Sequence, residues 1–201
     1  MSDALLRCIA ARIPTQGKYG TELRQTAALG RLDPDRELEL LLLDRREHVA
    51  EFLGPALRSG WIVILDRYYY SNAAYQGAEG LDPEAILLAN EKFAPRADLV
   101  LLLDVSPVVG LKRIELRGDF ANHFEKPETL ARCRSIFNSI ERSEIAKIDA
   151  TASADDVFHS AMTLFVRAFA ARMNELHGFT PKAAEAVRPL LKDAYGERAV
   201  A

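Results

Sequence analysis

The most informative run of this chain begins at residue 62 and reads Ile62-Val63-Ile64-Leu65-Asp66-Arg67-Tyr68-Tyr69-Tyr70-Ser71-Asn72-Ala73-Ala74-Tyr75-Gln76-Gly77. Its first four residues are continuously apolar, which predicts a short strand buried on both faces, as in parallel sheets. Ligands bind beyond the carboxyl ends of such strands. That end carries Asp66, whose oxygens suit Mg²⁺, and Arg67, whose planar guanidinium suits phosphate. These two residues alone leave open a purely structural ion pair.

Length and composition favour a single domain. The 201 residues are 49% hydrophobic, which is enough for one substantial core. A net charge of −3 and a pI near 5.9 give no basic footprint for nucleic acid, although small nucleotides can still bind. We expect no membrane partner, because no apolar run reaches membrane length and no signal peptide opens the chain. Cys8 and Cys133 lack metal-ligand spacing, which favours free thiols in a reducing cytoplasm.

Strand and helix patterns alternate along the chain, which predicts a parallel α/β fold with right-handed crossovers. Strands are expected at 5–11, 62–65, 98–105 and 146–150. Helices are expected at 21–29, 34–58, 83–93, 108–117, 130–141 and 154–174, the second kinked at Gly54-Pro55. The expected domain spans 1–176, and 177–201 is a helical or flexible extension.

The expected helix at 34–58 carries a charge among apolar residues. Its buried stripe is marked by residues that recur at steps of three and four, namely Leu38, Leu41, Leu42, Val49 and Phe52. Arg45 falls on the same stripe. A buried guanidinium is costly unless an anion meets it, so Arg45 requires an internal Asp or Glu, or a ligand phosphate.

The run that begins at Asp66 resembles the thymidylate kinase family. Members carry Asp-Arg-(Tyr/Phe/His) at this strand end, followed by Ser-(Ser/Asn/Thr)-x-Ala-Tyr and often Gln-Gly, as residues 66–68 and 71–77 do here. The resemblance spans roughly residues 7–174. It implies a three-layer fold of the P-loop kinase type, with strand order 2-3-1-4-5 and helices on both faces of the sheet. It also implies a cytoplasmic, homodimeric kinase that uses Mg²⁺ and transfers the γ-phosphate of ATP to dTMP, giving dTDP.

The resemblance assigns several residues to the acceptor nucleotide. Arg67 holds its phosphate, Asn72 hydrogen-bonds the base, and Tyr75 packs under the sugar. Arg45 matches the Arg of a Phe-x-x-x-Arg pattern that binds the acceptor phosphate. Leu41 replaces the aromatic residue that stacks on thymine, and it offers apolar contact without a ring face. The other expected acceptor contacts are Arg12, Tyr68, Ser71 and Gln76, with Arg12-Ile13-Pro14 standing where the family has Arg-Glu-Pro.

Residues for the donor nucleotide are expected further along the chain. Arg113 and Arg117 are four residues apart on one helix, which by itself is typical of a solvated basic face. The resemblance implies that both reach the phosphates of ATP, and that Arg117 is catalytic together with Asp66 and Arg67. It also implies that Asp66 binds the metal and that Ile148, Asp149 and Ala150 line the adenine pocket. Asn122-His123-Phe124-Glu125 stands where many relatives have Asp-Arg-(Ile/Phe)-Glu.

The motif G-x-x-x-x-G-K-[ST], which cradles donor phosphates, does not occur in the 201 residues. Gly17-Lys18 does not fit it because Tyr19 follows, so 17–20 is expected to be a loop. The strand, loop and helix of a P-loop kinase need about 25 residues before Arg12. We therefore expect a longer natural gene product, with this chain alone nearly inactive and prone to aggregate. The alternative function is a catalytically inactive nucleotide-binding or scaffold protein that retains the acceptor half.

Overall fold

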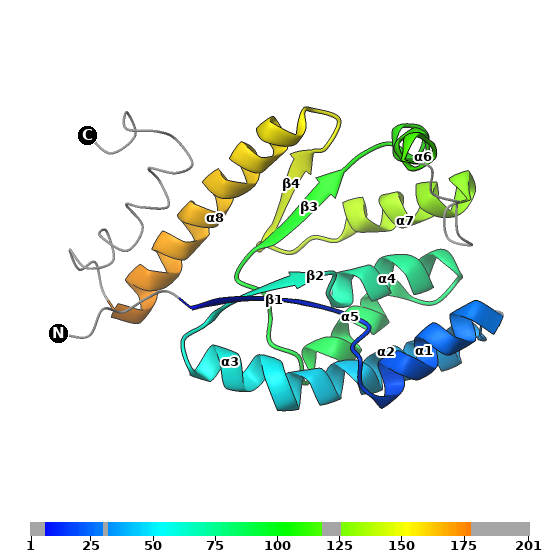
Figure 1. Ribbon diagram of the computed structural model, residues 1–201, viewed down its shortest axis with the longest axis horizontal. Helices are drawn as coiled ribbons and strands as arrows, with labels where there is room; N and C mark the ends of the chain where they lie inside the picture. Colours follow the sequence, from blue (N-terminus) through cyan, green and yellow to red (C-terminus); the bar gives the residue numbers. More distant parts are fainter. Residues whose placement is uncertain (1–6, 30–31, 118–125, 178–201) are drawn as a thin grey trace. The chain divides into compact units, whose positions relative to one another are not determined.

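A computed structural model of the chain describes residues 7–29, 32–117 and 126–177 (Figure 1). The chain divides into two compact units, one of residues 1–96 with 120–140 and the other of residues 97–119 with 141–201. Each unit has its own pair of parallel strands. The expected extension beyond residue 177 and the run 122–125 lie outside the described residues.

In the first unit, β1 (Cys8–Arg12) pairs in parallel with β2 (Ile62–Asp66). The register aligns Arg12 with Asp66, so both strands end at the same edge. The strand was expected at 5–11, and β1 ends one residue later than that, at Arg12. This pair corresponds to the neighbours 2 and 3 of the predicted strand order.

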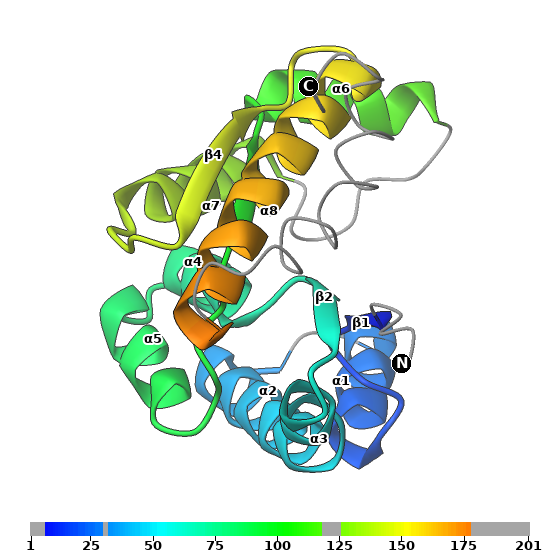
Figure 2. The same ribbon diagram turned by 90° about the vertical axis from the view of Figure 1, so that its left-hand side faces the viewer.

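In the second unit, β3 (Val100–Asp104) pairs in parallel with β4 (Ile145–Asp149), as strands 4 and 5 of the predicted order do. The described residues of this unit form two helices, α6 (Pro107–Leu116) and α8 (Ala154–His177). Ser106 caps α6, and α8 packs along β4 (Figure 2). The prediction of an α/β protein with parallel strands and flanking helices is confirmed.

The prediction that the strand at 62–65 is buried on both faces is wrong, and β3 is partly exposed as well. Ile64 in β2 is 54% exposed, and Leu103 in β3 is 52% exposed. Successive side chains of a strand point to opposite faces, so one face of each ladder carries the exposed residues. An apolar run therefore identified each strand correctly but overestimated how far it is covered.

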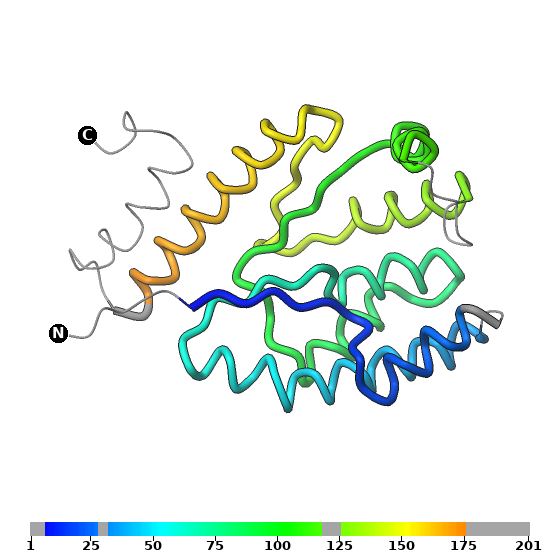
Figure 3. Tube along the Cα trace, in the orientation of Figure 1, coloured from blue at the N-terminus to red at the C-terminus, as the bar shows by residue number. Residues whose placement is uncertain are grey.

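Three consecutive helical segments follow Asp33, whose side chain accepts a hydrogen bond from the N–H of Asp35. They are α2 (Pro34–His48), a π-helical turn η1 (Val49–Leu53) and α3 (Gly54–Arg58), and Figure 3 shows one continuous path. The expected irregularity at Gly54-Pro55 takes the form of this π-turn, in which the Gly54 N–H bonds to the Val49 carbonyl, five residues back. Pro55 explains it, because proline has no N–H and its ring displaces the carbonyl four residues earlier.

Helix α1 (Lys18–Leu29) begins three residues before the expected start, so the prediction of a loop at 17–20 is wrong for 18–20. The reason is the close approach of the backbone before it. A Cβ atom on Gly20 would lie 2.1 Å from the carbonyl oxygen of Thr15. Gly20 is thus needed for packing inside a helix rather than for a turn.

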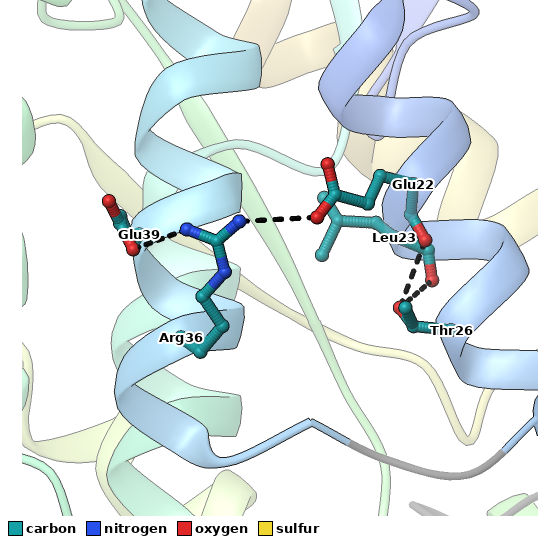
Figure 4. Close-up of polar contacts among 5 residues, drawn as sticks. All are labelled: Glu22, Leu23, Thr26, Arg36 and Glu39. Atoms are coloured by element: carbon teal, nitrogen blue, oxygen red, sulfur yellow. Dashed lines mark hydrogen bonds and ion pairs between the residues drawn. The ribbon is translucent and has the colours of Figure 1, made fainter.

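Helices α1 and α2 meet along an apolar seam of Leu23, Leu40 and Leu41, which are all buried. Arg36 of α2 connects Glu39 of its own helix with Glu22 of α1, as Figure 4 shows. Its guanidinium lies 2.6 Å from the Glu39 carboxylate and 3.2 Å from that of Glu22. Exposed ion pairs of this kind contribute little, so the leucines provide most of the stabilisation.

The buried stripe of α2 is rotated slightly from the expected one. Leu41 and Arg45 are buried as predicted, whereas Leu40 and Asp44 replace Leu38 and Leu42 as the other buried residues. Two of these four residues are charged, so α2 presents polar groups as well as leucines to the interior of its unit.

The centre of the first unit is α4 (Tyr69–Ala78), for which no helix was expected from the sequence. It packs against α5 (Pro83–Glu91) and α7 (Pro127–Ser139) and also contacts α2 (Figure 1). Seven of its ten residues are buried, so it is covered on nearly all sides. Both expected helices beside it exist, although α7 begins at its proline, three residues early.

Both cysteines are free, as expected, with Cys8 exposed and Cys133 buried. None of the helices in the described part of the chain combines the length and the apolar character needed to cross a membrane.

Candidate functional site

The parallel register of β1 and β2 brings an acid and a base together at the carboxyl edge of the ladder. The Nε atom of Arg12 lies 3.3 Å from Oδ2 of Asp66, and both side chains are largely exposed. Within the described residues, Asp66 therefore pairs with Arg12 and not with Arg67, which answers the question of a structural Asp66–Arg67 pair. Two of the predicted site residues are thus in contact.

Arg67 continues the chain beyond this edge with an unusual backbone. Its φ of 70° lies in the left-handed region, which non-glycine residues rarely adopt. The exposed guanidinium lies over the ring of Tyr75, 5.1 Å from its centroid. The ring faces one side of the guanidinium, so its planar fork remains available for a phosphate.

The guanidinium of Arg45 lies in the interior of the first unit, with 1% of the residue exposed. Its Nε donates to Oδ1 of Asn90 at 2.8 Å, and its Nη2 donates to Oδ1 of Asn72. The Tyr68 ring covers one face, 4.9 Å from the guanidinium carbon to the centroid. Of the two expected partners, an internal Asp or Glu does not meet the guanidinium among the described residues, where two amides and a ring contact it, and a ligand phosphate stays a prediction.

One edge of this buried cation is left without a partner. Nη1 of Arg45 has no hydrogen bond, although it is buried. Burial lowers the pKa of Arg45 to about 10, while Tyr68 and Asp44 oppose the shift. Burial also raises the pKa of Tyr68, whose neutral hydroxyl donates to the Pro95 carbonyl at 3.0 Å. The site is therefore a buried positive charge whose direct contacts are neutral groups, with one donor unused.

An unused acceptor lies on the helix that carries Asn72. Gln76 follows it by one turn of α4, both side chains are buried, and Oε1 of Gln76 has no partner. Ser71 is half-buried at the start of the same helix, where its N–H bonds to the Tyr68 carbonyl. Two residues of the motif 68–76, Tyr68 and Asn72, therefore contact Arg45 directly.

Asp44, next to Arg45 in α2, holds the turn that follows β1. Its carboxylate accepts from the Thr15 N–H at 3.0 Å and from the Thr15 hydroxyl at 2.5 Å. Arg24 donates to the carbonyls of Pro14 and Thr15, at 3.1 Å and 2.6 Å. The segment that begins with Arg12 is therefore fixed from two helices.

Leu41 lies in the seam between α1 and α2, 8% exposed and packed with Leu23 and Leu40. Its expected contact with thymine remains a prediction.

The sequence interpretation did not include two polar residues that the structure places in this network, Asp44 and Asn90. Both are fully buried, and each occupies an inward position of its helix. The usable signal was the same as for Arg45, a polar residue at an apolar position of the helical repeat.

In the second unit, Arg113 binds the turn after β4. Its Nη1 donates to the Ala150 carbonyl at 2.6 Å and its Nη2 to the Thr151 carbonyl at 3.3 Å. Asp149 accepts from the hydroxyl and the N–H of Thr151, and these bonds lower the pKa of its carboxyl group. Arg113 therefore fixes the turn that includes Ala150 and directly follows Asp149, two of the expected adenine-pocket residues, rather than lying on a free basic face.

Arg117 follows at the carboxyl end of α6, where its N–H bonds to the Ile114 carbonyl. Ile148, the third expected adenine contact, is buried at 5% exposure. The roles of these residues toward ATP remain predictions.

No group of three or more His, Cys, Asp or Glu side chains that could hold a metal occurs among the described residues. Mg²⁺ in nucleotide sites usually needs only one or two carboxylates, because phosphates and waters supply the rest. Asp66, exposed at a strand end with one oxygen on Arg12, fits that requirement.

Parallel strands flanked by helices are features of the α/β phosphotransferases with a P-loop kinase type of fold, and Arg12, Asp66 and Arg67 lie at one strand edge here. A family model described as thymidylate kinase matches residues 2–161. The chain belongs to the thymidylate kinase family.

Several named relatives agree with this assignment. A thymidylate kinase of Xanthomonas campestris pv. campestris (strain B100) is 51% identical over 173 residues, which cover 86% of this chain and 76% of that protein. One of Xylella fastidiosa (strain Temecula1 / ATCC 700964) is 48% identical over 171 residues, covering 85% and 82%. One of Xanthomonas euvesicatoria pv. vesicatoria (strain 85-10) is 49% identical over 179 residues, covering 89% and 79%.

Proposed function

We propose that this chain binds dTMP as the phosphate acceptor in the transfer of the γ-phosphate of ATP, which gives dTDP and ADP. Membership of the thymidylate kinase family supports the reaction. The main observation in support of an acceptor site is the buried guanidinium of Arg45. It contacts two amides and a ring, and its Nη1 donor is unused. Polar atoms buried without partners are uncommon, and a ligand is one reason for them.

The base of dTMP fits this polar cluster. Thymine presents carbonyl oxygens that accept hydrogen bonds and one N–H that donates. Nη1 of Arg45 would donate to a carbonyl oxygen, and Oε1 of Gln76 would accept from the N–H. This proposal moves Arg45 from the phosphate to the base, because its guanidinium is bonded to Asn72, the residue expected to bind the base.

The phosphate of dTMP is proposed to lie at Arg67, beyond the end of β2. Arg67 is exposed, and the Tyr75 ring supports its guanidinium. Arg12 lies at the end of the neighbouring strand and is a second cation at this edge. Phosphoryl transfer depends mainly on positioning and on charge neutralisation, for which guanidinium groups are suited.

On the donor side, Mg²⁺ held by Asp66 would neutralise charge on the phosphates of ATP when bound. Arg113 and Arg117 are proposed to act toward those phosphates, and Ile148, Asp149 and Ala150 toward adenine. The bonds from Arg113 to the turn after β4 support this, since they fix the shape of the segment concerned. A cytoplasmic homodimer is proposed on the resemblance alone, and sedimentation velocity would test the dimer.

Calorimetric titration with dTMP tests the acceptor site independently of turnover. Arg45→Ala should weaken binding by about 1.5–3 kcal/mol, as expected for hydrogen bonds to a charged group. Arg46→Ala is the matched control, because Arg46 is its exposed neighbour on α2, where its guanidinium lies over the Phe93 ring. That variant should bind dTMP nearly as the parent chain does.

Two outcomes separate the alternatives. Equal affinity in both arginine variants would overturn the assignment of Arg45 to the nucleotide. dTMP binding without ADP release in a coupled assay with ATP would favour the nucleotide-binding scaffold over the kinase.

A further inference from the structure

Asn90 lies behind Arg45 and belongs to none of the motifs discussed so far. It is on α5, fully buried, and separated from Arg45 by 45 residues in the sequence. Its Nδ2 donates to the carbonyl of Ile86 on the preceding turn at 2.8 Å. Because the amide nitrogen is used by its own helix, the amide oxygen is the atom that faces Arg45, and it accepts from Nε at 2.8 Å.

The guanidinium of Arg45 is planar, so each hydrogen bond restricts where its other donors point. The bond at Nε and the bond from Nη2 to Asn72 fix two directions in that plane. The Tyr68 ring covers one face, and the Tyr68 hydroxyl is itself bonded to Pro95. These contacts leave Nη1 in a fixed position with no partner.

Among the described residues, the three groups in contact with the Arg45 guanidinium, Asn72, Asn90 and Tyr68, are uncharged. The nearest carboxylate in the sequence, Asp44, is bonded to Thr15 instead. An aspartate at position 90 could offer an oxygen at the same place and would pair with the buried cation. An asparagine orients the guanidinium without adding a charge, so no carboxylate is bonded to Arg45 and Asp44 acts on its charge only from a distance.

We propose that Asn90 is a positioning residue of the acceptor site, which orients the Arg45 guanidinium and, being neutral, leaves its charge for an oxygen of the bound nucleotide. This inference rests on the proposed function. The oxygen is either a base carbonyl or a phosphate oxygen, since both accept from a guanidinium.

A double-mutant cycle with Arg45 tests the proposal. In the parent chain, Asn90→Ala should weaken dTMP binding by about tenfold or more, because the guanidinium loses its orientation. In an Arg45→Met background the same substitution should change binding less than about twofold. A merely structural asparagine would weaken binding by the same factor in both backgrounds, and that result would overturn the proposal. Asn90→Ser, a milder change, replaces Asn90→Ala in the cycle if the alanine variant does not unfold cooperatively.

Asn90→Asp tests the neutral charge separately. This variant retains an oxygen acceptor for Nε but adds a negative charge beside Arg45, so it should bind dTMP at least about tenfold more weakly than the parent. Binding equal to that of the parent would overturn the claim that neutrality matters.

Titration with thymidine, which lacks the phosphate, identifies the oxygen. Equal losses for thymidine and dTMP in Asn90→Ala would place a base carbonyl at Arg45, and a loss confined to dTMP would place the phosphate there and overturn the base assignment above. A parent chain that binds neither compound would overturn the proposed function. If the parent chain binds dTMP and Asn90→Ala binds it equally well, the role of Asn90 is overturned while the proposed function stands.

Discussion

Arg67 is the only non-glycine residue with a φ between +20° and +160° in the described part of the chain. A side chain in this left-handed region costs about 1–2 kcal/mol, because Cβ approaches the following carbonyl oxygen. The strained residue is also the one that places a guanidinium beyond β2. The strain and the predicted phosphate contact therefore belong to the same residue, as is common at binding sites.

The backbone strain at Arg67 can be measured by comparing two truncations. Arg67→Gly should be more stable than Arg67→Ala by about 1 kcal/mol, because only glycine adopts a φ of 70° without cost. Urea unfolding would give both free energies. The same two substitutions at Arg46, which lies inside α2, are the control. There Arg46→Ala should be more stable than Arg46→Gly by about 1 kcal/mol. Equal stability of the two Arg67 variants would contradict the strain.

His48 gives a prediction about pH. Burial lowers its pKa, Arg45 lowers it further, and Asp44 opposes both. The unfolded chain therefore binds a proton at a higher pH than the folded chain does, so stability is lost as the pH falls below 6.5. The His48 ring stacks on Phe52, with 5.0 Å between the ring centroids. Its Nδ1 has no hydrogen-bond partner, so no acceptor stabilises the protonated ring at that atom.

Thermal unfolding at about pH 7.5 and pH 5.5 would test this linkage. His48→Gln should lose less stability between the two values than the parent chain. His159→Gln, which alters an exposed histidine of α8, should lose as much as the parent. An identical loss in all three proteins would show that His48 does not contribute.

At the scale of the elements, Gly20 in the first turn of α1 has the closest neighbour of the glycines in the described residues. A Cβ on Gly20 would lie 2.1 Å from the Thr15 carbonyl oxygen and 2.8 Å from Oδ1 of Asp44. Gly20→Ala should therefore destabilise the chain by about 2 kcal/mol or more, despite the higher helix propensity of alanine.

Gly110→Ala on α6 is the matched control for that substitution. There the new Cβ would meet only the Val105 side chain, at an ordinary 3.8 Å. Alanine should be neutral or stabilising by up to about 1 kcal/mol at that position. Urea unfolding of both variants gives the comparison, and a destabilised Gly110→Ala with an unaffected Gly20→Ala would contradict the described packing.

The sequence predicted elements whose signals are local, and it missed those whose signals depend on burial. Asp33-Pro34 and Ser106-Pro107 predicted helix starts because capping involves near neighbours. Helix α4 was missed because burial on nearly all sides removes the amphipathic period, and Tyr68 at its N-cap provides no capping side chain.

The candidate site shows the same division. The burial of Arg45 follows from helical spacing and was predicted. Its partners Asn72 and Asn90 lie 27 and 45 residues away, so only tertiary packing brings them to it. No local rule could indicate that amides rather than a carboxylate would meet the guanidinium.

At the scale of the whole molecule, the strands expose apolar side chains that strands of this kind usually bury. Leu101 and Leu103 in β3 are 37% and 52% exposed, and Ile64 in β2 is 54% exposed. Exposed apolar strand residues favour association between chains. The expectation that this chain aggregates when expressed alone therefore remains a prediction with identified residues.

Replacing Ile64 and Leu103 by Thr should reduce aggregation without lowering stability by more than about 0.5 kcal/mol, because threonine suits strands and both sites are exposed. Light scattering during slow heating would measure aggregation. Leu40→Thr, at a position 1% exposed, should instead lower the unfolding temperature and increase scattering. Unchanged scattering in the double variant would mean that other surfaces drive association.

Asp44 and Arg45 are consecutive residues, so their side chains leave α2 about 100° apart around its axis. Asp44 is bonded to the turn after β1, and Arg45 is bonded to α4 and α5. A rotation of α2 about its own axis would break both sets of bonds together. The two flanks of the proposed acceptor site are therefore attached to neighbouring residues of one helix, and Thr15 and Asn72 are connected through a single turn of α2.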